Sequence, residues 1–116
     1  MTTIKEQSRQ FTAVEQYLMT SAPSITSIKD VQDGTSIDVD GYVIFDDVKE
    51  TGEVSEIMSI ITPEKQVYSC QSKTFKSSLK DIENIMAGEK YAIIKISGTT
   101  KAGRPYVNCV LDISKM

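Results

Sequence analysis

The sequence Tyr91-Ala-Ile-Ile-Lys-Ile-Ser-Gly-Thr-Thr-Lys-Ala-Gly-Arg-Pro-Tyr-Val-Asn-Cys-Val-Leu-Asp-Ile113 decides how the rest of the chain is interpreted. Two alternating runs flank a loop that contains two glycines, a lysine and an arginine. A period of two is typical of strands with one buried face, so the stretch predicts a β-hairpin. The predicted apolar face consists of Ala92, Ile94, Ile96, Val107, Cys109, Leu111 and Ile113. The predicted amphipathic face consists of Tyr91, Ile93, Lys95, Tyr106, Asn108 and Val110.

Three further strands are predicted upstream of this hairpin. The first covers Thr35–Phe45, and Gly41 in its middle is expected to let the strand bend sharply, as at the corner of a small barrel. Its two faces are predicted to be Ile37, Val39, Gly41, Val43 and Phe45 on one side, and Ser36, Asp38, Asp40, Tyr42 and Ile44 on the other. The second covers Val54–Thr62 and the third Gln66–Gln71, which predicts an antiparallel meander.

A helix is predicted between the third strand and the hairpin. Its apolar stripe consists of Phe75, Leu79, Ile82 and Met86. Ser78 and Asp81 resemble a capping box, which predicts that the regular helix starts there after a looser turn around Phe75. Gly88 suits the C-terminal cap.

This order of elements favours one fold. Three strands, a helix and two strands predict a mainly β, five-stranded OB-fold barrel with a helix between strands 3 and 4. A cupin or an SH3-like barrel fits less well, because neither needs that helix. The whole chain, residues 1–116, is expected to be one domain, with the barrel in residues 23–116.

Residues 1–22 are expected to form an N-terminal helical extension. Phe11, Val14 and Leu18 have helical spacing within residues 8–20, and Pro23 ends the pattern. The helix either packs on the barrel or offers a surface to another subunit, so a homodimer is one of the predicted arrangements.

The composition argues against an enzyme. The chain has no histidine, which removes the commonest general base and metal ligand. Cys70 and Cys109 are far apart and cannot alone make a zinc site, so neither a metal nor another cofactor is predicted. No run is apolar enough to span a bilayer and no secretory signal is recognised, so we expect reduced thiols, a cytoplasmic protein and no membrane partner.

The charge is distributed unevenly along the chain. Residues 1–63 contain 4 Lys/Arg and 11 Asp/Glu, whereas residues 64–116 contain 9 Lys/Arg and 5 Asp/Glu. The acidic half argues against a uniformly basic surface, while the basic half allows a local positive stripe. Chance solvation of exposed faces is the alternative explanation.

Three segments resemble a known family. Asp33-Gly-Thr-Ser-Ile37, Val67-Tyr-Ser-Cys-Gln-Ser-Lys-Thr-Phe75 and Gly98-Thr-Thr-Lys-Ala-Gly-Arg-Pro-Tyr106 resemble the small single-stranded DNA-binding proteins of phages that infect Gram-positive bacteria. The similarity extends to those of phi29-like phages and more closely to a lactococcal-phage type. It implies an OB barrel that coats displaced strands during replication or recombination, in the cytoplasm of the infected host. It also implies phage replication or recombination proteins as partners, although the acidic C-terminal tail of many bacterial single-strand binders is missing.

Binding of a single strand requires flat side chains that stack on bases and cations that meet phosphates. The candidate stacking residues are Tyr42, Tyr68, Tyr91 and Tyr106, while Phe75 on the helical stripe is expected in the core. The alternative is that tyrosines merely cover the outside of a small barrel. The candidate cations are Lys65, Lys73, Lys76, Lys95, Lys101 and Arg104, of which the last two lie in the hairpin loop that flanks the binding face of OB-folds.

Two alternatives to strand binding remain at this stage. An OB-type protein-interaction module that modulates a host replication protein is favoured by the acidic first half and the N-terminal helix. A small metal-dependent nuclease would use acids such as Asp38 and Asp40, but the carboxylates lack the expected pattern and are interpreted as a solvated edge.

Overall fold

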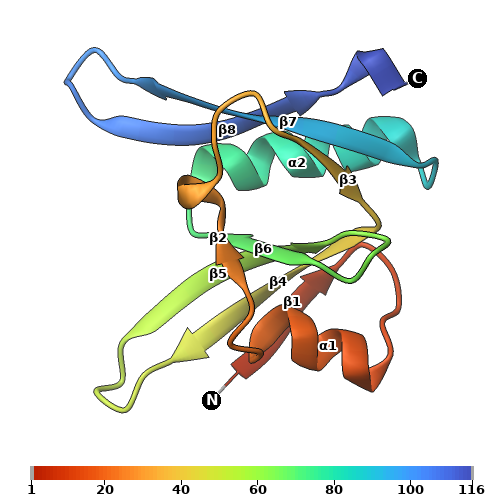
Figure 1. The fold of residues 1–116 in the computed structure, drawn as a ribbon. Coiled ribbons are helices and arrows are strands. Elements are labelled where there is room, and N and C mark those ends of the chain that lie inside the picture. The colour runs from red at the N-terminus through yellow and green to blue at the C-terminus, as the bar shows by residue number, and fades with distance from the viewer. Residues whose placement is uncertain (1, 116) are drawn as a thin grey trace.

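The chain forms two facing β-sheets and two α-helices in a computed structural model that describes residues 2–115 (Figure 1). The larger sheet has the order β1 (Thr2–Gln7), β4 (Gly41–Val48), β5 (Val54–Ile61), β6 (Val67–Cys70) and β2 (Thr26–Ser27). The smaller sheet has the order β3 (Ser36–Val39), β7 (Tyr91–Thr99) and β8 (Pro105–Leu111). The helices are α1 (Ala13–Thr20) and α2 (Lys73–Met86), with short 3₁₀ helices η1 (Ile28–Asp30) and η2 (Ile113–Lys115). The prediction of a mainly β fold with a helix before the last two strands is confirmed.

One bent strand connects the two sheets. β3 pairs with β7 in the smaller sheet, and β4, which begins two residues after β3 ends, pairs with β1 and β5 in the larger sheet. The chain turns from one sheet to the other at Asp40 and Gly41, which confirms the bend that we predicted from the glycine. A side chain at position 41 would have to displace the ring of Phe11, because its Cβ would lie 2.7 Å from Cζ of that residue.

The bend also changes which side chains of this strand point to the same core. Ile37 and Val39 share the core between the sheets with Tyr42 and Ile44, whereas Val43 and Phe45 pack on the opposite side of the larger sheet. The prediction that alternation continues unbroken through Gly41 is therefore wrong. β4 is buried on both faces because α1 covers the outer face of the larger sheet with Met19.

The predicted inward face of β7 is also wrong. Tyr91 and Ile93 lie in the core between the sheets, and Lys95 follows them on the same side, opposite Cys109 of β8. Val107, Cys109 and Leu111 of β8 point to the core as predicted. The charge of Lys95 favoured an exposed position, but an ion pair with Asp33 allows the side chain to be buried.

Helix α2 lies between the two sheets, along β8 (Figure 1). Its stripe of Phe75, Leu79 and Met86 is buried, as predicted. The helix starts earlier than the expected box at Ser78, since the hydroxyl of Ser72 accepts a hydrogen bond of 3.2 Å from the backbone N–H of Phe75. Gly88 follows the helix with φ +92°, a conformation that suits glycine in a C-terminal cap.

The N-terminal segment differs most from the prediction. Residues 2–7 form a strand at the edge of the larger sheet, whereas we predicted only a helix within residues 1–22. The pairing satisfies the backbone of the edge of β4, a requirement that the polar sequence of β1 does not reveal. The predicted stripe is also incomplete: Phe11 precedes α1 and is buried, but Val14 is 68% exposed.

A polar cluster fixes α1 to the sheet. Glu15 Oε1 accepts the backbone N–H of Thr12 at 3.0 Å, and its Oε2 accepts Arg9 Nη2 at 3.2 Å and Lys65 Nζ at 3.0 Å. Arg9 also binds Oδ2 of Asp40 at 2.9 Å. These hydrogen bonds lower the pKa of Glu15 from 4.5 to about 2. The backbone N–H of Thr12 contributes most, and Lys65 and Arg9 contribute less. The cluster therefore joins the helix, the turn after β5 and the bend between the sheets.

The described strands form two sheets and do not close into a five-stranded barrel. In residues 2–115, β6 and β8 are not paired, and β2 occupies two positions on the edge of β6 instead. Across this seam the Ser72 hydroxyl donates a hydrogen bond of 3.0 Å to the carbonyl of Val107. The seam therefore stays open.

One buried hydroxyl gives a test of the packing. Within the described chain, Oγ of the fully buried Ser59 on β5 has no hydrogen-bond partner. An unpaired buried hydroxyl costs on the order of 1 kcal/mol or more, so Ser59→Ala is expected to raise the free energy of unfolding by about 1 kcal/mol in urea denaturation. Ser55→Ala, on the half-buried part of the same strand, is the control and should change stability by less than about 0.5 kcal/mol. A loss of stability in Ser59→Ala would show that this hydroxyl is paired.

Candidate functional site

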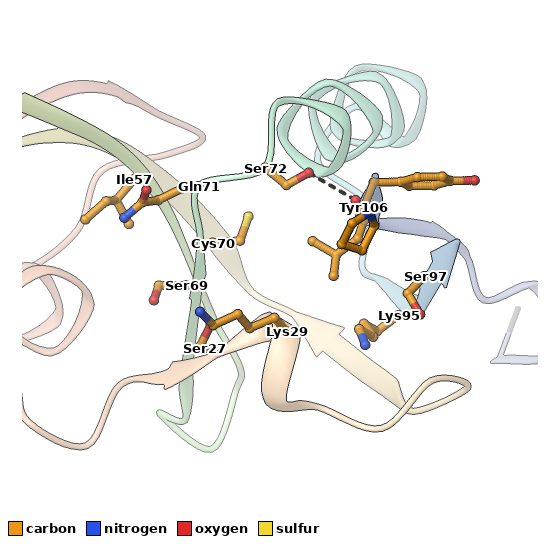
Figure 2. Close-up of a pocket in the computed structure, with 12 residues that line it drawn as sticks. Ser27, Lys29, Ile57, Ser69, Cys70, Gln71, Ser72, Lys95, Ser97 and Tyr106 are labelled. Carbon is orange, nitrogen blue, oxygen red and sulfur yellow. Dashed lines mark hydrogen bonds between the residues drawn. The ribbon is translucent and has the colours of Figure 1, made fainter. Parts of the chain in front are cut away.

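A groove of about 720 Å³ occupies the open seam between the two sheets, and we call it the seam groove (Figure 2). Its polar lining consists of Ser27, Ser69, Gln71, Ser72 and Ser97 with the two lysines Lys29 and Lys95, and its apolar lining includes Ile57, Cys70 and Val107. The residues come from β2 and η1, from β5 and β6, and from the β7–β8 hairpin. None of the described residues lining it is acidic, so the groove favours an anionic or hydrogen-bonding ligand.

Lys95 enters the groove from β7. It is 4% exposed, and its Nζ donates a hydrogen bond of 2.6 Å to Oδ1 of Asp33 in the loop before β3. The hydroxyl of Ser97 donates to the other oxygen of Asp33. Both contacts lower the pKa of Asp33, and the hydrogen bond from Lys95 has the larger effect. The backbone of the loop follows β7 as well, because Gly34 N donates to the carbonyl of Lys95 at 2.8 Å and Lys95 N donates to that of Thr35 at 3.0 Å.

Lys29 supplies a second cation. It follows the buried Ile28 on η1 and is exposed, and Figure 2 shows its side chain extending along the groove on the side opposite Lys95. Sequence reasoning missed Lys29 and Asp33. The turn at Asp33-Gly34 was recognisable, but nothing in the chain indicated which strand this loop would contact.

The loop of the β7–β8 hairpin carries the predicted cations Lys101 and Arg104. Its backbone is closed by hydrogen bonds from Thr100 N to the Arg104 carbonyl at 2.9 Å and from Gly103 N to the Thr100 carbonyl at 2.9 Å. Both cationic side chains are exposed, and within residues 2–115 neither has a recorded ion pair. Arg104 directly precedes Pro105, which lines the seam groove, so the basic loop extends the groove outward.

Tyr106 lies at the rim of the groove. It is 37% exposed, and Figure 2 shows its ring pointing away from Lys29 and Cys70. The ring crosses the neighbouring strand at Gly98, where an added Cβ would lie 2.5 Å from the tyrosine oxygen. The ring therefore lies over Gly98 beside the basic loop, on the outer side of the hairpin.

The prediction that Tyr42 and Tyr91 point outward is wrong. They are 6% and 7% exposed in the core between the sheets, with their hydroxyls hydrogen bonded to Glu6 at 3.4 Å and to Glu83, respectively. Burial raises the pKa of Tyr42 to about 12, and burial followed by Glu83 raises that of Tyr91. Tyr42 points inward because of the bend between β3 and β4, and Tyr91 because the face of β7 that meets the core is the opposite of the predicted one. Because both rings are buried, neither has a face free to stack on a base.

Tyr68 and Lys73 lie apart from the groove lining described above. Tyr68 is half-buried against the core between the sheets, with its hydroxyl 3.4 Å from Oε1 of Gln66. Lys73 is exposed at the start of α2, where it lines a separate hollow with Lys76 and Lys80. Of the predicted binding residues, Lys95 and Tyr106 line the seam groove, while Lys101 and Arg104 are exposed on the adjoining β7–β8 loop.

The two cysteines are free and buried. Burial raises the pKa of Cys70 to about 11 and that of Cys109 to about 12, so both thiols stay protonated near neutral pH. Within residues 2–115, no group of three His, Cys, Asp or Glu side chains is placed to hold a metal ion. No helix in that range is sufficiently long and apolar to span a membrane.

Comparison of the chain with protein-family models, with curated proteins and with solved structures found no match.

Proposed function

We propose that this protein is an OB-fold single-stranded DNA-binding protein that coats displaced DNA, largely without regard to sequence, during phage replication or recombination. The observation that carries the proposal is the seam groove with its two lysines and five uncharged polar side chains, continued by the basic loop at Lys101 and Arg104. Single-strand binders combine a positively charged groove that follows the nucleic-acid backbone with flat side chains that stack on the bases.

The arrangement of strands supports the OB assignment. The bent strand β3–β4, then β5, β6, α2, β7 and β8 follow the OB order, and OB barrels are partly open. OB-folds bind along their second and third strands and beside the loops that join strands 1 to 2 and 4 to 5. The corresponding elements here are β5 and β6, which contribute Ile57, Ser69 and Cys70 to the groove, and the β7–β8 loop.

The buried tyrosines change the expected mode of binding. With Tyr42 and Tyr91 in the core, base stacking is left to Tyr106 and to the guanidinium of Arg104. Contacts to phosphate from Lys29, Lys95, Lys101 and Arg104 then carry a larger share of the affinity, which makes binding strongly dependent on salt.

The deciding experiment is a mobility-shift titration with poly-dT and with a duplex of the same length. We expect binding to the single strand to be at least about tenfold tighter, with log K falling linearly as log salt concentration rises. Equal affinity for both forms, or no binding to either, would refute the proposal.

A protein-interaction module is the second candidate, because α1 exposes two large apolar side chains. Val14 is 68% and Tyr17 54% exposed, and their spacing of three places them on one face of the helix. If the protein is an interaction module, we expect no binding to poly-dT. In a pull-down, the wild-type chain should retain a single host replication protein, and the double variant Val14→Ser, Tyr17→Ser should not retain it.

A further inference from the structure

We propose that Asp33 is an internal competitor of the bound strand: its carboxylate occupies the place on Lys95 that a phosphate oxygen takes when single-stranded DNA enters the seam groove. This inference rests on the proposed function and adds a control of affinity to the same site.

Lys95 is the fixed partner in this exchange. Its side chain is 5% exposed on the inner side of β7, and within the described chain its only recorded hydrogen bond from Nζ goes to Asp33. An ammonium group carries three donors, so two remain for a ligand in the groove that Lys95 lines. A buried ammonium needs an anion beside it, since an uncompensated buried charge is strongly destabilising.

Asp33 is the partner that can leave. Its side chain is 53% exposed, so water can solvate the carboxylate once it separates from Lys95. The loop itself stays in place, because the backbone hydrogen bonds of Gly34 and Thr35 with Lys95 do not involve the carboxylate. The asymmetry between a buried cation and a half-exposed anion makes replacement of Asp33 by another anion a local event that leaves the strand pairing intact.

A phosphate is suited to replace this carboxylate. Its oxygens accept hydrogen bonds from the ammonium and from the neighbouring hydroxyl of Ser97, which now donates to Asp33. The strand must therefore displace Asp33 before it gains the charge of Lys95. Among the described residues, Lys29 has no recorded salt bridge in the free protein, whereas Lys95 contributes to binding only against the competition of Asp33.

Asp33→Asn tests the competition directly. The amide retains an oxygen that can accept from Lys95 but removes the negative charge. In the wild type, the counterion that the phosphate releases at Lys95 is offset by the negative charge that is freed on Asp33, whereas in Asp33→Asn the contact counts in full. The salt dependence of log K for a single strand is therefore expected to steepen by about 0.7, which corresponds to about fivefold tighter binding of poly-dT at 0.1 M salt. Glu89→Gln is the matched control with the same change of net charge, because Glu89 is exposed just before β7, at the strand end away from the basic loop.

A double-mutant cycle separates this effect from a general gain of positive charge. In a Lys95→Gln background, Asp33→Asn is expected to leave affinity and salt slope unchanged, because no buried ammonium is released. If the wild type binds poly-dT but Asp33→Asn is no tighter than Glu89→Gln, the competition is refuted while the proposed function stands. If neither the wild type nor Asp33→Asn binds single-stranded DNA, the proposed function itself fails.

The unmodified protein gives a second readout that does not depend on how the variants fold. Titration with oligo-dT should move the ¹³C resonance of the Asp33 side-chain carboxyl toward the value of a free aspartate. An unchanged resonance at saturation would show that Asp33 stays on Lys95 and would overturn the inference.

Discussion

Replacing Lys101 and Arg104 together with alanine is expected to weaken binding to poly-dT about 25-fold at 0.1 M salt and to reduce the salt slope of log K by about 1.4. Each phosphate contact contributes about 0.7 to the slope on a single strand, which is about a factor of five at that salt concentration. Both side chains are exposed on the β7–β8 loop and have no recorded ion pair among the described residues, so their removal should not disturb folding.

The measurement is a set of fluorescence-anisotropy titrations at several salt concentrations. The control is Lys80→Ala with Lys90→Ala, which removes the same charge from α2 and from the segment before β7. It should change the affinity by a small factor and leave the slope close to that of the wild type. An unchanged slope in the Lys101, Arg104 variant would place the binding surface elsewhere on the protein.

Glu15→Gln is expected to lower the free energy of unfolding by about 2 kcal/mol at pH 7. The fall in the pKa of Glu15 from 4.5 to about 2 corresponds to about 3 kcal/mol, and solvent screening of Arg9 and Lys65, which are 37% and 52% exposed, reduces this value. Glutamine retains an oxygen for the backbone N–H of Thr12, so the variant keeps the capping box and removes only the charge.

The pH dependence gives the direction of this effect. A carboxylate whose pKa is lower in the folded state stabilises the protein fully above its unfolded pKa, and the stabilisation is lost as pH falls through the folded pKa. The difference between wild type and Glu15→Gln should therefore be constant above about pH 5, shrink below pH 4.5 and nearly vanish at pH 2. Urea denaturation across this range measures it, with the exposed Glu53→Gln as the control. A difference that persists at pH 2 would assign the effect to packing.

The sequence was informative wherever local pattern and packing agreed. The stripe of Phe75, Leu79 and Met86, the bend at Gly41 and the hairpin of the last two strands were predictable because each depends on near neighbours in the chain. The strand β1 was not, because its pairing is required by the edge of β4 rather than by its own residues.

The candidate site was predictable only in part for the same reason. Lys101 and Arg104 were identified from the loop that contains them, and their exposure follows from that loop. The burial of Lys95 depends on Asp33, which is 62 positions away, and the burial of Tyr91 depends on which face of β7 meets α2. Alternation shows that a strand has two faces, but the charged residue in this strand suggested the wrong one.

The bent strand also implies an order of events during folding. β4 pairs with β5 across a short loop, with Val48 opposite Val54, whereas β3 pairs with β7 across 58 positions, from Ser36 to Ile94. Closing the longer loop loses more chain entropy before any contact forms, and such distant pairings slow folding. The larger sheet is thus expected to assemble while Ser36–Val39 is still unpaired. The seam groove would then take shape last, when β7 and β8 join that free half of the strand.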